Sequence, residues 1–149
     1  MTDEVGRFIE RFAGVLVEGG MPRMPARVFT ALLASDSGRL TAAELAEALK
    51  VSPAAVSGAV RYLVQTQLVE REREPGSRRD VYRLGDDPWY EAVYRREALV
   101  SRWQRALSEG AAAVGEDTPA GHRLQDSASF FAFLAEELPG LLARWRERR

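Results

Sequence analysis

The side chains of this sequence that could do chemistry are mainly arginines and small hydroxyls, whereas nucleophiles and metal ligands are scarce. The chain has no cysteine and one histidine, His122. It lacks an HExxH pair, a G-x-S-x-G nucleophile motif and a glycine-rich phosphate loop. Asp86-Asp87 and Glu136-Glu137 are neighbours in sequence, so their side chains diverge instead of converging on a metal. We therefore expect no enzymatic activity, no metal and no cofactor.

The distribution of charge is more informative than its sum. The formal net charge is -1, yet residues 21–85 hold ten bases against seven acids, and residues 86–140 hold five bases against ten acids. Lys50 is the only lysine among 21 bases, and arginine forms forked hydrogen bonds with guanine and phosphate. A basic middle segment suits a protein in which one part meets phosphate and another meets protein. Ordinary solvated surfaces would also explain the pattern, so charge alone leaves both interpretations open.

The segment from Pro53 to Gln65 is the part of the sequence whose arginine and hydroxyl side chains have the most specific arrangement. Ser52 is a good N-cap ahead of Pro53, which favours a helix start. At about 100° per residue, the aliphatic positions share one side: Val56, Ala59, Val60 and Leu63. The opposite side has no acid and is small near its start: Ala54, Ser57, Gly58, Arg61, Tyr62 and Gln65. Such a face fits the DNA major groove, where Arg61 and Gln65 could read base edges. The hydroxyls suited to phosphate belong to Ser52, Ser57 and Tyr62. A helix pair with a merely solvated outer face is the competing interpretation.

The elements around this segment follow from hydrophobic spacing, prolines and caps. Helices are predicted over residues 3–17, 25–34, 41–49, 53–65, 88–114 and 126–148, with Pro25 at the first position of the second and Pro139 kinking or splitting the last. Thr41 and Glu44 fit a capping box. Strands are predicted over 68–73 and 81–84, and a turn over 118–125. Two helices, a short turn, a helix and a hairpin make up a winged helix-turn-helix. The expected fold is mainly α with a small β-hairpin wing, flanked by N- and C-terminal dimerisation helices.

The tip of the predicted hairpin places two adjacent arginines, Arg78 and Arg79, at a turn. A β-ribbon can lie over the DNA backbone and insert a guanidinium into a narrow minor groove. Exposed loops also commonly carry charge. Because residues 70–73 alternate acid and base, some arginines there could be engaged by acids, and we favour Arg78 and Arg79 over Arg71 as contacts.

Two stretches, GMPRMPARVFTALL and LTAAELAEALKVSPAAVSGAVRYLVQTQLVEREREPGSRRDVYRL, resemble the core of MarR-type regulators, nearest the GbsR-like branch. The resemblance covers about residues 19–90. It implies a homodimeric repressor of transcription that binds a pseudo-palindromic operator in double-stranded DNA. It also implies contacts from these positions: Ser52, Ala54, Ser57, Gly58, Arg61, Arg78 and Arg79. Two positions depart from the family pattern, because Gly58 stands where an arginine is frequent and Gln67 where a glycine commonly ends the helix.

The flanking segments are more apolar than the middle domain alone could bury. Five aromatic residues lie outside the winged core: Trp103, Phe130, Phe131, Phe133 and Trp145. We predict that they form a two-fold interface between copies of the chain. The expected organisation is a dimerisation helix over 1–20, the DNA-binding domain over 21–86 and dimerisation helices over 87–149. A winged-helix module that binds protein and has lost DNA binding is the alternative function.

A small-molecule effector is a further hypothesis, because many relatives respond to one. The aromatic residues that could line its pocket are Trp89, Tyr90, Tyr94 and Trp103. Aromatic rings can cage a quaternary ammonium such as choline or betaine, the effector type associated with the GbsR-like branch. Aromatics at helical spacing more commonly form plain core, so both interpretations stay open. The sequence shows no apolar run long enough for a membrane span and no secretion signal, so a cytoplasmic protein without membrane contact is expected.

Overall fold

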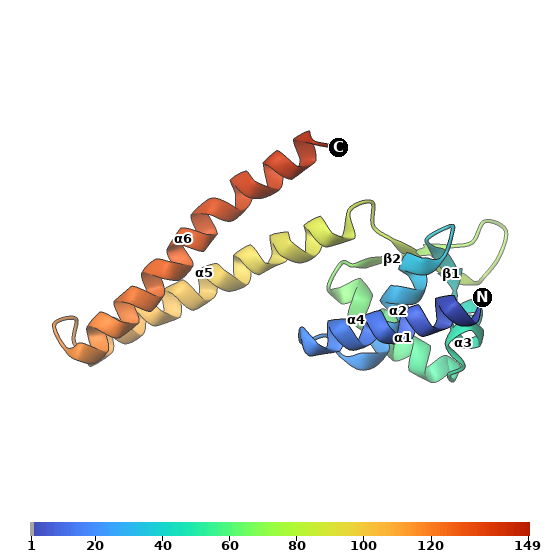
Figure 1. Cartoon of the computed structure of the whole chain (residues 1–149), viewed down its shortest axis with the longest axis horizontal. Coiled ribbons are helices and arrows are strands. Elements are labelled where there is room, and N and C mark those ends of the chain that lie inside the picture. Colours follow the sequence, from blue (N-terminus) through green and yellow to red (C-terminus); the bar gives the residue numbers. More distant parts are fainter. Residues whose placement is uncertain (1) are drawn as a thin grey trace. The chain divides into compact units, whose positions relative to one another are not determined.

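The computed structural model describes residues 2–149, and these residues form two compact units, one up to Trp89 and one from Tyr90 onward. The first unit contains four helices and a three-stranded sheet (Figure 1). Its helices are α1 (Asp3–Glu18), α2 (Arg23–Ala34), α3 (Ala42–Leu49) and α4 (Pro53–Gln65). Its strands are β1 (Arg39–Thr41), β2 (Val69–Arg73) and β3 (Asp80–Leu84). The predicted fold class, mainly helical with a small wing, is therefore confirmed.

Helix α2 is the centre of the first unit, because it contacts α1, α3, α4 and β3. Its Val28, Phe29 and Leu32 are fully buried, and so is Ile9 of α1, which packs on α2. The rings of Phe29 and Trp89 meet edge to face with centroids 5.4 Å apart. Helix α1, assigned from the sequence to dimerisation, thus belongs to the core of this unit.

The strands pair in the order β1-β3-β2, and both pairings are antiparallel. The two predicted strands of the hairpin are confirmed within one residue, but β1 was not predicted. The sequence predicts helices over 25–34 and 41–49 and no strand between them. In the structure Leu40 lies opposite Tyr82, so β1 adds a third strand to the hairpin, and its last residue, Thr41, is also the N-cap of α3.

Helix α2 begins at Arg23, two residues before the position predicted from Pro25. The backbone N–H groups of the first helical turn have no partner inside the helix, so a proline is tolerated throughout that turn. Pro22 is the N-cap residue, and Ala26 N–H donates to its carbonyl at 3.0 Å. Pro25 therefore lies inside the first turn instead of opening it.

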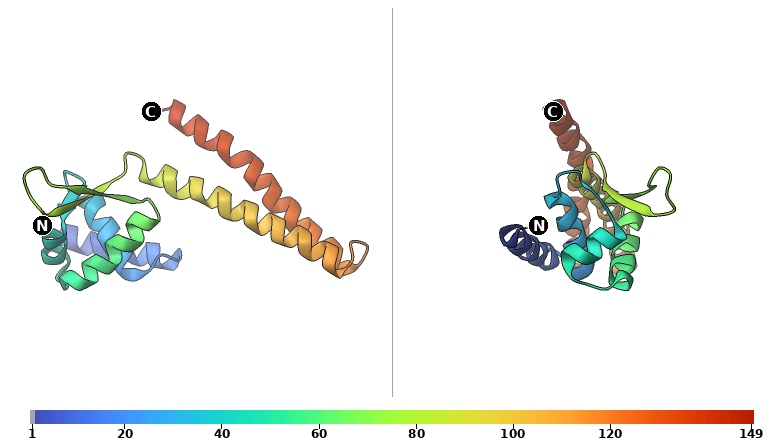
Figure 2. Two further views of the ribbon diagram at one scale, coloured as in Figure 1. Left: turned by 180° about the vertical axis from the view of Figure 1, so that it is seen from behind. Right: turned by 90° about the vertical axis from the view of Figure 1, so that its right-hand side faces the viewer.

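The second unit is a hairpin of two helices (Figure 2). Helix α5 (Pro88–Val114) has the predicted bounds, and α6 (Pro119–Glu147) follows after a short turn. The predicted turn over 118–125 and the helix start near Asp126 are wrong. Thr118 accepts a hydrogen bond from Gly121 N–H at 2.9 Å and caps a helix that starts at Pro119, so His122 lies in the first turn of α6. Pro139 lies inside α6 without splitting it.

A close backbone approach explains why glycine is required at the start of α6. A Cβ atom added to Gly121 would lie 2.0 Å from the carbonyl oxygen of Gly115. The turn between α5 and α6 is therefore tight because residue 121 has no side chain.

Among the residues from Thr2 to Arg149, no helix is both long and apolar enough to cross a membrane.

Candidate nucleic-acid interface

Helix α4 divides into the two faces that its sequence predicts. Val56, Ala59, Val60 and Leu63 are at most 2% exposed, which anchors the helix to the core. The opposite face is exposed at Ala54, Ser57, Gly58, Arg61 and Gln65, while Tyr62 is half-buried. No residue from 2 to 89 covers this face, so it is accessible to a partner. The side chain of Arg61 has no hydrogen bond or ion pair to any residue from 2 to 149.

The turn ahead of α4 is short and locally determined. Three residues, 50–52, connect α3 to α4. Lys50 ends α3 in the left-handed conformation with φ of 57°, and Ser52 accepts a hydrogen bond from Ala55 N–H at 3.2 Å. The Ser52 hydroxyl keeps its own proton for donation. The predicted capping box of α3 is also present, because Thr41 and Glu44 exchange hydrogen bonds at 2.9 and 3.1 Å.

The end of α4 accounts for one departure from the family pattern. Gln67 has φ of 61°, a left-handed conformation that glycine adopts at least cost. Its N–H donates to the carbonyl of Val64 at 3.0 Å, and the next N–H, of Leu68, donates to Leu63. The chain therefore leaves α4 as it would with glycine at position 67, and the wing follows in its expected place.

The arginines of the wing differ in how strongly acids hold them. Arg79 Nη2 lies 3.0 Å from Glu74 Oε2, and Arg71 Nε lies 3.9 Å from Asp80. Arg71 also lies over the ring of Tyr82, at 5.7 Å from its centroid. Arg78 has no ion pair or hydrogen bond within the described chain, and neither has Arg73. Of the two predicted wing contacts, Arg78 is thus free and Arg79 is paired.

Sequence reasoning missed Arg73, and the signal that could have found it is strand alternation. Successive residues of a strand point to opposite faces, so Arg71 and Arg73 lie opposite to Glu70 and Glu72. The alternating acids and bases therefore cannot neutralise one another within β2. The acids instead pair with arginines of neighbouring strands.

Glu70 and Glu72 form ion pairs in a network centred on Arg83. Arg83 Nε donates to Glu72 at 2.7 Å, and its Nη2 pairs with Glu70. Arg39 of β1 pairs with Glu72 at 3.4 Å. The hydrogen bond to Glu72 raises the pKa of Arg83 above its ordinary value, so Arg83 stays charged at any working pH. These contacts join all three strands.

The four aromatic residues of the effector hypothesis lie in different surroundings. Trp89 packs against Phe12 and Phe29 in the first unit. In the second unit, Trp103 meets Phe131 edge to face at 5.4 Å. The rings of Tyr90 and Tyr94 are stacked at 6.0 Å, and the guanidinium of Arg146 lies 3.7 Å above Tyr90. Only Tyr90 and Tyr94 are in contact, and a cation already covers one of them.

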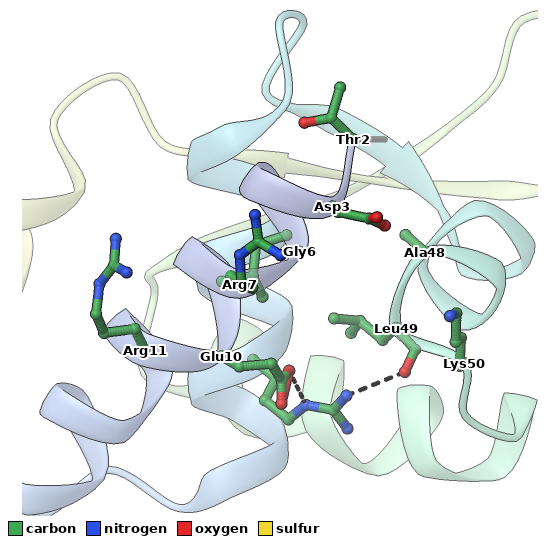
Figure 3. A pocket seen from close by; sticks show the side chains of 11 residues that line it. Thr2, Asp3, Gly6, Arg7, Glu10, Arg11, Ala48, Leu49 and Lys50 are labelled. Carbon is green, nitrogen blue, oxygen red and sulfur yellow. Dashed lines mark hydrogen bonds and ion pairs between the residues drawn. The ribbon is translucent and has the colours of Figure 1, made fainter.

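An open groove of about 630 Å³ lies between the start of α1 and the end of α3 (Figure 3). Arg27 lines the groove, with Nε 2.7 Å from Glu10 and Nη2 donating to the carbonyl of Leu49 at 3.0 Å. Arg7, Arg11 and Lys50 also line the groove, together with Asp3. Within the described residues, no three acidic or histidine side chains gather where they could hold a metal.

Comparison with known proteins gives matches along most of the chain. A family profile described as MarR family matches residues 19–80, and one described as MmpR5-like MarR family transcriptional regulator matches residues 87–148. The chain is 26% identical to the HTH-type transcriptional regulator MmpR5 of Mycobacterium tuberculosis, over 97% of this chain and 88% of that protein. It is also similar to a crystal structure of a transcriptional regulator, with a TM-score of 0.84, 26% identity and coverage of 97% of this chain and 99% of that one.

Proposed function

We propose that the chain is a winged-helix transcriptional regulator of the MarR family, which the two family profiles and the 26% identical regulator support, and that it acts as a homodimeric repressor on a pseudo-palindromic DNA operator. In this proposal α4 enters the major groove and the wing lies along the backbone. The contacts come from the exposed face of α4, from Ser52 at its start and from Arg78 and Arg79 at the wing. The finer assignment to the GbsR-like branch stays a prediction.

The observation that carries the proposal is the exposed, acid-free face of α4. Arg61 lies on it without an internal partner, so its guanidinium loses no protein contact when it binds a base. A guanidinium can donate two hydrogen bonds to O6 and N7 of guanine. Ala54, Ser57 and Gly58 leave the start of the helix small enough to approach the base edges.

Selection of bound duplexes from a random pool tests the proposal, because it reports binding, sequence preference and half-site spacing together. With the selected operator, Arg61→Ala should cost about 1–3 kcal/mol in binding free energy and relax one base position. Arg11→Ala, which removes an exposed cation of α1 instead, is the matched control and should leave the preference unchanged. A pool that yields no enriched sequence would contradict sequence-specific binding.

The dimer is supported by the apolar surface of the second unit. Eight large apolar side chains there are more than a third exposed: Val93, Tyr94, Trp103, Val114, Phe130, Phe133, Leu141 and Trp145. The two helices do not bury these eight side chains against each other, and an exposed apolar surface of this kind is typical of an interface with a partner. A second copy supplies it and would place two recognition helices about 34 Å apart, one turn of DNA.

Light scattering after size-exclusion chromatography tests the dimer. The parent should be a dimer at micromolar concentration, and Phe133→Glu should shift it toward monomer because a carboxylate would be buried in the interface. Ser108→Glu adds the same charge at an exposed polar position of α5 and should leave the dimer intact. A monomeric parent would contradict the proposal.

Release from DNA by a small-molecule effector has fewer structural observations behind it than DNA binding or the dimer. Tyr90 and Tyr94 present stacked rings, and Arg146 shows that a cation fits over Tyr90. A quaternary ammonium that binds these rings would have to displace Arg146. Thermal-shift measurements with choline and betaine should show stabilisation, which Arg146→Ala should increase. No shift in either protein would contradict this effector class.

The alternative, a winged-helix module that binds only protein, makes a different prediction. A DNA-binding protein should bind mixed-sequence duplex at low salt and lose affinity steeply as salt rises. A protein-binding module should not respond to duplex at any salt concentration. One titration therefore separates the two functions.

A further inference from the structure

The wing has two faces that differ in charge, and the difference follows from its strand register. On one face, two arginines (Arg39, Arg83) are matched by Glu70, Glu72 and the neighbouring Asp86. On the other face, Arg71 and Arg73 of β2 lie opposite Tyr82 and Asp80 of β3. Asp80 is the one carboxylate of that face within the hairpin. The first face is therefore neutral to acidic, and the second is basic.

The basic face continues into the tip of the hairpin. Arg78 and Arg79 lie there with Glu74, so this face and the tip together hold four arginines against two carboxylates. Both carboxylates are engaged, since Asp80 pairs with Arg71 and Glu74 with Arg79. Arg73 and Arg78 are left exposed, with no partner among residues 2–149.

We propose that Arg73 and Arg78 form a phosphate-binding strip on the basic face of the wing, and that the opposite face, with Arg39 and Arg83, is turned away from DNA. This inference rests on the proposed function and assigns an orientation to the wing. The chemistry favours duplex phosphate, because exposed guanidinium groups without internal partners lose no ion pair when they bind an anion. On the opposite face, each arginine would have to leave a carboxylate first.

Arg83 is the main partner of the acids on the neutral-to-acidic face. It binds Glu70 and Glu72 at once, and its Nη1 lies 3.4 Å from Asp86 Oδ1. Strand alternation places these two carboxylates of β2 on the face opposite to Arg73, and Arg83 neutralises them there. Without Arg83, Glu70 would lose its ion pair and Glu72 would keep only Arg39, so the hairpin would carry more uncompensated negative charge and attract phosphate less.

The test is a salt titration of binding to a mixed-sequence duplex, because phosphate contacts do not depend on sequence. Arg73→Ala and Arg78→Ala should each reduce the slope of log K against log salt by about 0.9 per lost phosphate contact in each protomer. Arg39→Ala is the matched control: it removes the same charge from an exposed position of the same sheet, but on the acidic face. Its slope should equal that of the parent.

Two outcomes overturn the inference while leaving DNA binding intact. Equal losses for Arg73→Ala and Arg39→Ala would mean that only net charge matters. An unchanged slope for Arg73→Ala beside a reduced slope for Arg78→Ala would mean that the tip alone touches the backbone. A parent that binds no duplex would instead contradict the proposed function itself.

Glu74→Gln provides a second, gain-of-function test. It removes the carboxylate that holds Arg79 at 3.0 Å and leaves the arginines in place. Affinity for mixed-sequence duplex should rise, with a steeper salt dependence. An unchanged or lower affinity would mean that the tip, with Arg78, does not lie against phosphate, and would contradict the proposal.

Discussion

Arg27 of α2 donates a hydrogen bond from Nη2 to the carbonyl oxygen of Leu49, the last residue of α3, at 3.0 Å. The last carbonyls of a helix have no partner inside it, and a cation at that end also interacts favourably with the helix dipole. The same guanidinium is paired with Glu10 of α1 at 2.7 Å. One side chain thus fixes the end of α3, and with it the turn into α4, against the first two helices.

Arg27→Met should lower the free energy of unfolding by about 1–2 kcal/mol, because it leaves Glu10 and the Leu49 carbonyl without their donor. The guanidinium is largely covered, with 18% of its side chain exposed, whereas Glu10 is 54% exposed, which moderates the effect. Urea unfolding followed by circular dichroism measures the change. Arg11→Met, at an exposed cation of the same groove, should stay within about 0.5 kcal/mol of the parent. Equal stabilities of the two variants would show that the bridge contributes nothing.

No contact inside the protein requires glycine at position 58, because a Cβ atom there would meet nothing within 4 Å. Gly58→Ala should therefore stabilise α4 by about 0.5–1 kcal/mol through helix propensity. If the helix approaches base edges at this point, the same methyl group should weaken operator binding. Thermal unfolding and a DNA titration on one preparation measure the two effects.

Gly6→Ala is the matched control for Gly58, because Gly6 lies in α1 and a Cβ atom there also meets open space. It should give a similar gain in stability with unchanged operator affinity. If Gly58→Ala binds the operator as tightly as the parent, α4 does not approach DNA closely at residue 58.

The sequence predicts α4 well because its signals are local. Ser52, Pro53 and the aliphatic spacing determine both the start and the buried face, and the structure agrees at each of the four buried positions. Helix α6 was predicted less well, because the residues after Thr118 have little apolar patterning. Its true start is determined by a cap and by the close approach of Gly121 to Gly115, which sequence spacing does not reveal.

The paired and free arginines of the wing could not be separated by sequence alone. The string Glu-Arg-Glu-Arg in β2 suggests pairing between neighbours, but strand geometry places acids and bases on opposite faces. Whether an acid is neutralised then depends on β1 and β3, and β1 was not predicted. Arg73 was missed for this reason.

Gln67 offers a test of backbone strain. Its φ of 61° is unfavourable for a residue with a Cβ atom, so Gln67→Gly should raise the free energy of unfolding by about 0.5–1 kcal/mol. Gln65→Gly, two residues earlier in the right-handed helix, should instead lower stability by about 0.5–1 kcal/mol. Urea denaturation measures both variants. The same sign for the two substitutions would contradict the left-handed conformation at residue 67.

Gly121 tests the turn on which the second unit depends. A Cβ atom at this position would lie 2.0 Å from the carbonyl oxygen of Gly115 and 3.0 Å from Cα of Glu116, both of which are backbone atoms that cannot rotate away. Gly121→Ala should therefore force α5 and α6 apart at the turn and destabilise the hairpin by about 1–3 kcal/mol, the usual cost of overpacking. Because the proposed dimer uses the surface of this hairpin, the dissociation constant measured by sedimentation should rise as well.

Gly110→Ala separates this steric effect from a general effect of helix propensity. Its Cβ atom would meet a side-chain atom of Leu124 at 3.5 Å, an ordinary contact, in the same unit. This variant should be as stable as the parent or more so, because alanine favours the helix by about 0.5–1 kcal/mol over glycine. A Gly121→Ala protein that unfolds at the same urea concentration as Gly110→Ala would mean that the turn tolerates a side chain, and the short connection would then have another cause.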